Sequence, residues 1–148
     1  MIARTSREPA PASRRRRTAA QHAVLDALGG SERFRSAQQL HRQLRQQQPQ
    51  QIGLTTVYRI LRTLVDEAVA ETQRAEDGEL LYRLRTTSEH RHYLLCRLCG
   101  RAEAFTPTAF EDHASQLIRQ LGYIDVTHHF DLYGVCPRCR GSQPRRAS

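Results

Sequence analysis

Four cysteines in two C-x-x-C pairs are the residues whose spacing points most directly to chemistry. The pairs are Cys96-Arg97-Leu98-Cys99 and Cys136-Pro137-Arg138-Cys139, and the sequence holds no other cysteine. Each C-x-x-C turn presents two sulfurs to one metal ion, and two such turns complete a tetrahedron of thiolates. The spacing therefore predicts a structural Zn²⁺ ion bound by Cys96, Cys99, Cys136 and Cys139.

Two other uses of these cysteines are disulfide bonds and a redox-active dithiol. Disulfides need an oxidising compartment, and no secretory signal pattern precedes the cysteine pairs in this sequence. A redox dithiol would account for one C-x-x-C pair and leave the second without a role. Zinc is therefore the favoured interpretation.

Histidine and glutamate residues form a second group of metal-ligand types. His90 and His92 are two residues apart on an expected strand, so both imidazoles would point to one face. Glu111 falls in the first turns of an expected helix, and His128 and His129 fall late in the last expected strand. One of these two, with the other three residues, would form a site acceptable to Zn²⁺, Fe²⁺ or Mn²⁺. Such ligands exchange metal more readily than four thiolates, as a sensor requires, whereas ordinary surface histidines are the alternative.

Positive charge is concentrated at the front of the chain. The net charge is +8, and all 23 basic residues are arginine. Residues 1–65 hold 12 Arg against 3 acidic residues, residues 66–85 hold 3 against 6, and residues 86–148 hold 8 against 6. Arginine suits phosphates and guanine edges, although a GC-rich genome would also favour it. The distribution favours nucleic-acid binding by the first half.

Apolar spacing predicts a winged helix-turn-helix in that first half. Helices are expected from the arginine run at 14–17 to Leu28, from an N-cap at Ser36 to near Pro49, and from a cap at Thr55 or Thr56 to Val65, followed by strands at 68–74 and 80–85 around a turn at 76–78. In this arrangement the third helix lies in the major groove. An ordinary amphipathic surface helix is the alternative. The residues expected to face DNA are Thr56, Tyr58, Arg59 and Arg62, with Arg14, Arg15, Arg16 and Arg17 ahead of the first helix.

The second half predicts a small α/β domain. Strands are expected at 91–95 and 102–105, then a helix from Thr106-Pro107 to Leu121 and a β-rich segment at 123–133. These elements are too few to bury both faces of a sheet, so dimerisation is expected. The expected fold class is α+β, with zinc knuckles in the dimerisation domain. The predicted divisions are a disordered basic arm at 1–13, a DNA-binding domain at 14–85, a metal-binding dimerisation domain at 86–140 and a disordered tail at 141–148.

Three segments together resemble the ferric uptake regulator family. They are Ser36-Ala37-Gln38-Gln39-Leu40-His41, Gly53-Leu54-Thr55-Thr56-Val57-Tyr58-Arg59 and His90-x-His92-x-x-x-Cys96-x-x-Cys99. The likeness covers about residues 14–140, and within the family it is greatest to zinc uptake regulators. It implies a dimeric, metal-dependent transcriptional repressor with an N-terminal winged helix and a C-terminal dimerisation domain.

The resemblance also implies roles for individual residues. The family's four-cysteine zinc site coincides with the two C-x-x-C pairs. Its site at the dimerisation domain falls on His90, His92, Glu111 and His128, which selects His128 over its neighbour. Tyr58 and Arg59 match positions on the DNA-recognition helix, where Tyr58 would contact a base or sugar and Arg59 a base or phosphate.

The chain departs from the family at a further regulatory site between the domains. Glu71 fits the acidic position of that site, but Arg85 or a neighbour stands where zinc-type members have a cysteine, and Arg91 and Tyr93 replace two histidines. Arginine stays protonated and cannot bind a metal ion. The site is therefore expected to be absent, or rebuilt from Glu71, Glu79 or Glu89.

These features predict a metal-responsive, zinc-dependent repressor of metal-uptake genes. The expected partners are a palindromic double-stranded DNA operator and a second copy of the chain, in the cytoplasm, with no membrane and no small-molecule substrate. The second, exchangeable metal is expected to be Zn²⁺, with Fe²⁺ or Mn²⁺ as alternatives. A constitutive winged-helix repressor without the sensor is a further alternative. An enzyme is not expected, because the sequence has no H-E-x-x-H motif and no nucleophile motif.

Overall fold

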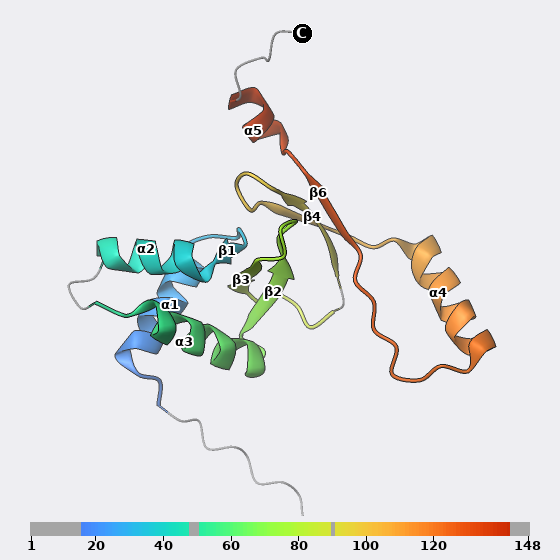
Figure 1. Cartoon of the computed structure of the whole chain (residues 1–148), viewed down its shortest axis with the longest axis horizontal. Coiled ribbons are helices and arrows are strands. Elements are labelled where there is room, and N and C mark those ends of the chain that lie inside the picture. Colours follow the sequence, from blue (N-terminus) through green and yellow to red (C-terminus); the bar gives the residue numbers. More distant parts are fainter. Residues whose placement is uncertain (1–15, 48–50, 90, 143–148) are drawn as a thin grey trace, which may run out of the picture.

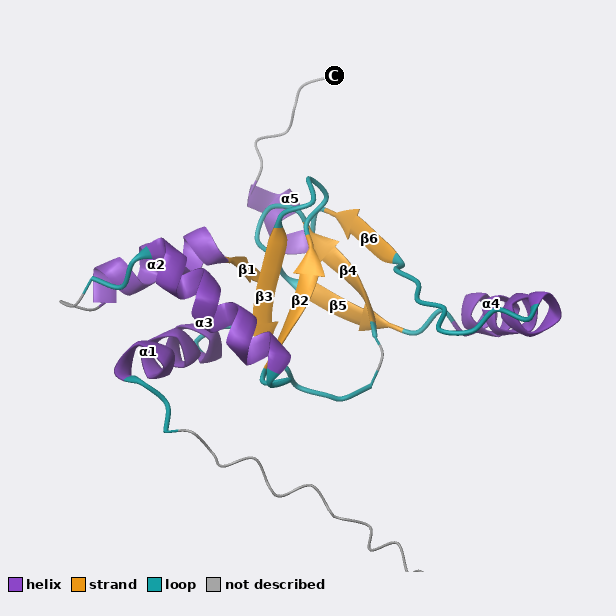
Figure 2. Ribbon diagram, turned by 60° about the horizontal axis from the view of Figure 1, so that its bottom comes forward, coloured by secondary structure: helices purple, strands orange, loops and turns teal. Residues whose placement is uncertain are grey.

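The computed structural model describes residues 16–47, 51–89 and 91–142, and two small sheets lie between helices in it (Figures 1 and 2). The elements in chain order are α1 (Ala19–Gly29), β1 (Arg35–Ser36), α2 (Ala37–Gln47), α3 (Leu54–Asp66), β2 (Ala70–Arg74), β3 (Leu80–Leu84), β4 (His92–Cys96), β5 (Ala102–Phe105), α4 (Thr108–Leu121), β6 (Asp131–Gly134) and α5 (Pro137–Ser142). The predicted α+β class and the winged helix-turn-helix are confirmed.

Helices α1, α2 and α3 enclose the larger hydrophobic core. The apolar residues of α3 recur at helical spacing and face inward, and Val57 and Leu61 are fully buried there. They pack against α1, α2, β2 and β3. The opposite face of α3 is left to solvent, which is the exposure that a DNA-recognition helix requires.

Local capping explains two of the helix starts. Thr18 and Gln21 form a capping box at α1. At α2 the Gln39 amide donates to Ser36 Oγ at 3.2 Å, and the Ser36 amide donates to Gln39 Oε1 at 2.9 Å, which confirms the predicted N-cap. The prediction of a threonine cap for α3 is wrong, because α3 begins at Leu54 and its N-cap is Gly53, which has no side chain to form a cap hydrogen bond.

Strands β2 and β3 form the wing, an antiparallel hairpin that turns at Gly78, where φ is +88°. The short strand β1 adds to the other edge of β3, and the sequence did not predict it. The expected start of β2 at residue 68 is wrong by two residues. Ala68 has a left-handed backbone with φ of +56° and ends the turn after α3, so pairing begins at Ala70.

The second sheet has the order β5-β4-β6, with β5 antiparallel and β6 parallel to β4. The expected strand over 123–133 is wrong for residues 123–130. Only Asp131–Gly134 pairs, with Tyr93–Cys96 of β4. The preceding residues instead form the loop that carries His128.

Helix α4 stands apart from both sheets, joined to them by loops on either side (Figures 1 and 2). Its bounds agree with the sequence, and Gly122 closes it in the left-handed conformation with φ of +69°. No residue of α4 is buried, and Leu117 and Leu121 are 47% and 61% exposed. Helix α5 was not expected and continues through Ser142, past the predicted start of the tail. No helix of the described ranges is long and apolar enough to cross a membrane.

A smaller core joins the wing to the second sheet. Phe34, Leu81, Tyr93 and Leu95 are buried together in it. Beside them the Phe34 amide donates to the Gly100 carbonyl at 3.0 Å. Gly100 has φ of +71°, and a Cβ atom there would lie 2.2 Å from the Phe34 carbonyl oxygen, so the contact requires glycine.

Candidate metal centres and DNA-facing helix

The four cysteines converge at one end of the second sheet. Cys96 ends β4, Cys99 follows in the turn, and Cys136 and Cys139 lie at the start of α5. Their sulfurs all lie within 4.8 Å of one another, and the cysteines are free rather than disulfide-bonded. Cys99 Sγ and Cys136 Sγ are 3.8 Å apart. Tetrahedral zinc with Zn–S bonds of about 2.3 Å requires sulfurs about 3.8 Å apart, so the cluster fits that ion.

The protonation of these sulfurs also favours a cation. Burial opposes ionisation of Cys96, but backbone amides of Cys136, Cys99 and Leu98 donate to its sulfur and lower its pKa to about 6. Contacts with the sulfurs of Cys136 and Cys99 raise the pKa of Cys139 to about 12. Crowded sulfurs thus resist full ionisation by themselves, and a metal cation among them would stabilise all four thiolates.

A second cluster joins three separate segments: His92 from β4, Glu111 from the first turn of α4 and His128 from the loop before β6. Glu111 Oε1 lies 2.5 Å from His92 Nε2 and 3.1 Å from His128 Nε2. The two Nε2 atoms are 3.4 Å apart. Metal–nitrogen bonds of about 2.0–2.1 Å in a tetrahedron place two nitrogens about 3.3 Å apart, so the two imidazole nitrogens have the spacing of ligands to one ion. The 2.5 Å between Glu111 Oε1 and His92 Nε2 is the distance of a short hydrogen bond, and the carboxylate would move away from that nitrogen to share the ion.

The His92 ring is oriented to offer Nε2 as a ligand. Its Nδ1 lies 3.1 Å from the Phe130 carbonyl oxygen, which can only accept, so Nδ1 carries the hydrogen. In the neutral ring Nε2 then bears a lone pair facing the Glu111 carboxylate, another acceptor. A proton or a metal cation must lie between them. Hydrogen bonding to His92, and then to His128, lowers the pKa of Glu111 and keeps it anionic.

Aromatic rings surround this cluster. Phe105 and Phe130 lie 6.0 and 5.8 Å from the His92 ring, and Phe110 lies 5.7 Å from the His128 ring, centroid to centroid. His92 is only 4% exposed. Apolar walls lower the local dielectric and strengthen the attraction between a cation and the carboxylate.

The structure brings together three of the four residues predicted for the second site. His90 lies outside the described residues. His129 is exposed and belongs to neither metal-ligand cluster of the described residues. Of the two histidines that the residue pattern left open, the geometry therefore places His128 at the cluster.

The predicted remnant of a third metal site does not form a ligand cluster. The described part of the chain contains two such clusters, and neither includes Glu71, Glu79 or Glu89. Glu71 instead accepts hydrogen bonds from Arg83, with Oε1 2.5 Å from Nη2 and 3.0 Å from Nε. Arg85 and Arg91 face other groups: Arg85 donates to the Thr87 carbonyl oxygen, and Arg91 pairs with Glu89 at 3.6 Å.

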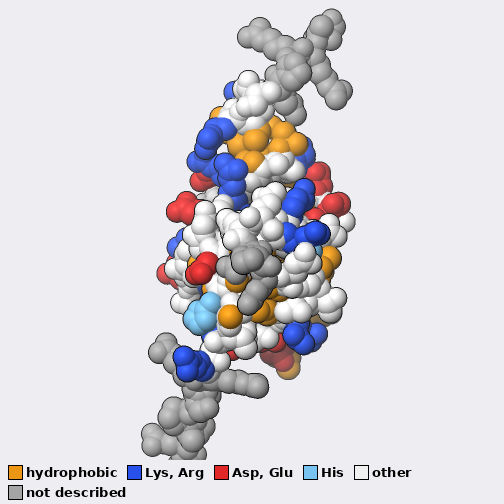
Figure 3. Space-filling view, turned by 90° about the vertical axis from the view of Figure 1, so that its left-hand side faces the viewer, with side chains coloured by type: hydrophobic (Ala, Val, Ile, Leu, Met, Phe, Trp, Pro, Cys, Tyr) orange, Lys and Arg blue, Asp and Glu red, His pale blue; other side chains and the backbone are white. Residues whose placement is uncertain are grey.

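Residues expected to contact DNA lie on the outer face of α3 and before α1. Tyr58 is 42% exposed, and Arg59 and Arg62 are also exposed, whereas Thr56 is half-buried at the start of the helix. From the α2 side, arginine side chains are spread over the surface among uncharged ones (Figure 3). Arg16 is exposed, Arg17 lies 3.5 Å from Glu67 after α3, and Arg14 and Arg15 lie outside the described residues.

Two features of the sites were missed in the sequence. Arg83 was given no role, although counting outward from the turn at 76–78 places it opposite Glu71 on the hairpin. The phenylalanines around the histidines also went unnoticed, because Phe130 is 20 residues or more from Phe105 and Phe110 and the three carry no spacing signal.

Comparison with known proteins agrees with this geometry. The profile described as "Ferric uptake regulator family" matches residues 13–133. The zinc uptake regulation protein of Mycobacterium tuberculosis is 36% identical over 125 residues, which are 84% of this chain and 95% of that protein. The ferric uptake regulation protein of Cupriavidus metallidurans is 31% identical over 116 residues, 78% of this chain and 80% of that protein.

Solved structures show the same fold. The ferric uptake regulator of Vibrio cholerae is 26% identical and covers 82% of this chain and 92% of its own, with a TM-score of 0.64. A zinc uptake regulator solved with zinc and DNA is 22% identical, covers 84% and 83%, and also has a TM-score of 0.64. With a family match over most of its length, the chain belongs to the ferric uptake regulator family of metal-responsive, DNA-binding transcriptional regulators, and it is not an enzyme.

Proposed function

We propose that this protein is a zinc-dependent repressor that represses metal-uptake genes when zinc is plentiful. The observation that carries the proposal is the convergence of His92, Glu111 and His128 from three segments on one point. A metal ion at this site would tie the three segments together, and the same chain carries an exposed α3 suited to DNA. The name of the Mycobacterium tuberculosis relative favours zinc as the signal.

The two metal sites have different roles in this proposal. Cys96, Cys99, Cys136 and Cys139 hold a structural Zn²⁺ ion that ties the end of β4 to α5. The second site exchanges its metal and is the sensor, and His90 is its proposed fourth ligand. Fe²⁺ or Mn²⁺ would suit the same nitrogen and carboxylate ligands, so availability in the cell decides between them.

The division of labour follows the two halves of the chain. Residues 14–85 bind DNA, with Thr56, Tyr58, Arg59 and Arg62 toward the groove and Arg14–Arg17 near the backbone. Residues 86–140 bind metal and dimerise, and the segments at 1–13 and 141–148 act as a basic arm and a tail. A regulator with this partner belongs in the cytoplasm.

A second copy of the chain is the proposed occupant of the exposed apolar face of α4. Phe110, Leu117 and Leu121 are 43%, 47% and 61% exposed on a helix that has no buried residue. Apolar area of this kind marks an interface. A twofold dimer would present two α3 helices to two half-sites of a palindromic operator. Metal at the base of α4 would then set the spacing between them.

The test is DNA binding at controlled free metal. Fluorescence anisotropy is measured with the DNA upstream of the protein's own gene, at fixed salt, after the exchangeable metal has been removed. Zinc, and anaerobically Fe²⁺ or Mn²⁺, are added at buffered free concentrations. Restored binding at far lower free Zn²⁺ than Fe²⁺ is expected. Arg59→Ala should bind weakly at every metal concentration, because it removes a contact to DNA rather than to metal.

Two other results would change the proposal. If Fe²⁺ or Mn²⁺ restores DNA binding at a lower free concentration than Zn²⁺ does, that ion is the signal, and the proposed mechanism of metal-dependent repression stands. Tight binding that ignores all three ions, with the four-cysteine zinc retained, would instead identify a constitutive repressor.

A further inference from the structure

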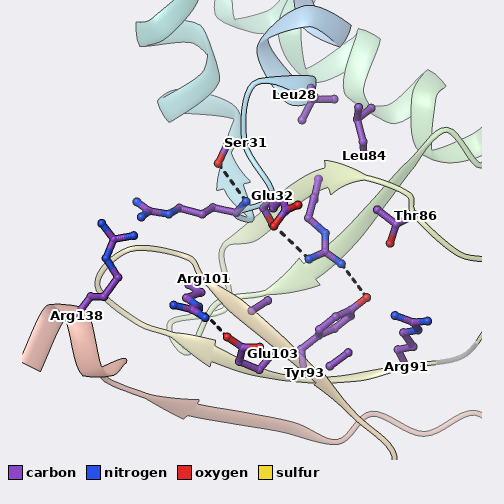
Figure 4. A pocket seen from close by; sticks show the side chains of 15 residues that line it. Leu28, Ser31, Glu32, Leu84, Thr86, Arg91, Tyr93, Arg101, Glu103 and Arg138 are labelled. Atoms are coloured by element: carbon purple, nitrogen blue, oxygen red, sulfur yellow. Dashed lines mark hydrogen bonds and ion pairs between the residues drawn. The ribbon is translucent and has the colours of Figure 1, made fainter.

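Arg83 lies at the junction between the wing and the second sheet and contacts both. From β3 it donates to Glu71 on β2, and its Nη2 also donates to the Tyr93 hydroxyl oxygen on β4 at 2.9 Å. Its Nη1 donates to the Glu32 carbonyl oxygen at 3.3 Å. Arg83, Tyr93 and Glu32 line a cleft of about 690 Å³, in which Figure 4 labels Tyr93 and Glu32.

The contacts of Arg83 with Glu71 and Tyr93 are largely protected from solvent. The side chains of Arg83 and Glu71 are 11% and 19% exposed, and Tyr93 is 5% exposed. The guanidinium also lies 4.4 Å from the ring centroid of Phe34 and 5.0 Å from that of Tyr93. Charged hydrogen bonds are stronger in such a site than in water, and removing one partner leaves a buried group unsatisfied. This is unlike the exposed ion pairs elsewhere, such as Arg101 with Glu103.

The cluster is adjacent to the proposed sensor on one side and to the recognition helix on the other. Tyr93 directly follows His92 on β4, and their side chains point to opposite faces of the strand. Glu71 lies on β2, which follows α3 after a tight turn closed by the Val69 amide and the Leu64 carbonyl oxygen. A displacement of β4 at the metal site therefore reaches the wing through one layer of side chains.

We propose that Arg83, Glu71 and Tyr93 form a coupling cluster, which positions the wing and α3 relative to the exchangeable metal site. The inference rests on the proposed function. The Glu71 carboxylate accepts from the Arg83 guanidinium, and the Tyr93 hydroxyl oxygen accepts from the same guanidinium. The junction is thus held by hydrogen bonds that are present without metal. Metal at His92 acts on DNA affinity by moving β4, which the cluster connects to the wing.

The first test removes one hydroxyl. Tyr93→Phe keeps the ring against Phe34 and loses the hydrogen bonds to Arg83 and Glu71. Metal affinity of the exchangeable site, measured by competition with a chromophoric chelator, should stay within about twofold. The ratio of DNA affinities with and without metal should fall about tenfold, the usual effect of losing a hydrogen bond to a charged group. Tyr82→Phe is the matched control, since Tyr82 is also 5% exposed but its hydroxyl has no hydrogen bond among the described residues.

A double-mutant cycle and a metal count complete the test. Glu71→Gln and Tyr93→Phe should each lower the ratio, and the double variant should lower it less than the product of the two, because both act through Arg83. Zinc content should be two ions per chain in the wild type and in Glu71→Gln. A third ion that Glu71→Gln removes would overturn the proposal and restore a metal site at the junction.

The remaining outcomes separate the two proposals. An unchanged ratio in Tyr93→Phe, with normal metal dependence in the wild type, would refute the coupling cluster and leave the repressor intact. A wild type whose DNA binding ignores metal would refute the proposed function, and the coupling role with it. If Tyr82→Phe and Tyr93→Phe lower the ratio of DNA affinities equally, the cluster contributes only to general stability and has no coupling role.

Discussion

At the scale of single residues, the exchangeable site depends on the contact between the His92 imidazole and the Glu111 carboxylate, which are both acceptors when the imidazole is neutral. His92 uses its Nδ1 hydrogen on the Phe130 carbonyl oxygen, so its Nε2 faces Glu111 Oε1 at 2.5 Å with a lone pair. The contact is favourable only with a positive species between the two atoms. A metal ion satisfies His128 as well, whose Nε2 lies 3.1 Å from the same oxygen. Glu111 is therefore the residue on which the two imidazoles converge.

Replacing Glu111 by glutamine tests this. Glu111→Gln keeps the size of the side chain and removes its charge, so the affinity for Zn²⁺ at the exchangeable site should fall by at least about tenfold. DNA binding should then require correspondingly higher free zinc. Asp112→Asn is the control, because Asp112 is an exposed neighbour that belongs to neither cluster of the described residues. Equal zinc requirements in the two variants would contradict the assignment of Glu111.

At the scale of elements, a backbone contact holds the segment before β1 against the first zinc knuckle, and the ion pair between Arg97 and Glu76 joins that knuckle to the wing turn. The Phe34 amide reaches the Gly100 carbonyl oxygen in a turn that has left-handed backbone at Gly100. The core formed by Phe34, Leu81, Tyr93 and Leu95 then closes over this contact. The position of the coupling cluster thus depends on a close approach that only a residue without a side chain permits.

Gly100→Ala should disturb that approach. The new methyl group would lie 2.2 Å from the Phe34 carbonyl oxygen on a backbone with φ of +71°, so backbone must move. We expect the free energy of unfolding to fall by more than about 1 kcal/mol, as for other residues forced into an incompatible conformation. Thermal or urea unfolding of the zinc-loaded protein measures it. Gly141→Ala on α5, where a Cβ meets nothing within 4 Å, should be nearly neutral.

At the scale of the whole molecule, α4 is a helix whose apolar residues the single chain does not bury. It stands away from both sheets (Figure 2), and its apolar residues are exposed along one stripe. The same helix supplies Glu111 at its first turn. The same helix therefore carries the proposed dimer interface and a metal ligand, so metal binding can alter the spacing between the two DNA-binding halves of a dimer.

Leu117→Asp should weaken the dimer. A charge placed in an apolar interface loses its hydration without gaining a partner. Sedimentation equilibrium should show dissociation at protein concentrations where the wild type is dimeric, and operator binding should weaken with it. Gln116→Asp is the matched control, since it adds the same charge at an exposed polar position of the same helix. An unchanged dimer in Leu117→Asp would place the interface elsewhere.

The sequence by itself determined the elements whose signals are local. Helical spacing in α3, the Ser36 cap and the hairpin turn each depend on residues a few positions apart, and the C-x-x-C pairs carry their ligand geometry within four residues. The predictions failed where a local signal was weak or overruled. The β-rich residues 123–130 form no strand, and only residues 131–134 of this segment pair with β4, because β-propensity does not by itself supply a partner strand.

Only the tertiary structure decided which distant groups meet. It brought His128, the histidine that the family resemblance selects, beside Glu111, and it enclosed the site with phenylalanines from three segments. It also turned Glu71 from a possible metal ligand into the partner of Arg83. The physical reason is the same in each case. A carboxylate binds whichever cationic group the fold places beside it. Which groups lie beside it depends on how segments far apart in sequence pack together, and the burial of apolar residues along the whole chain decides that packing.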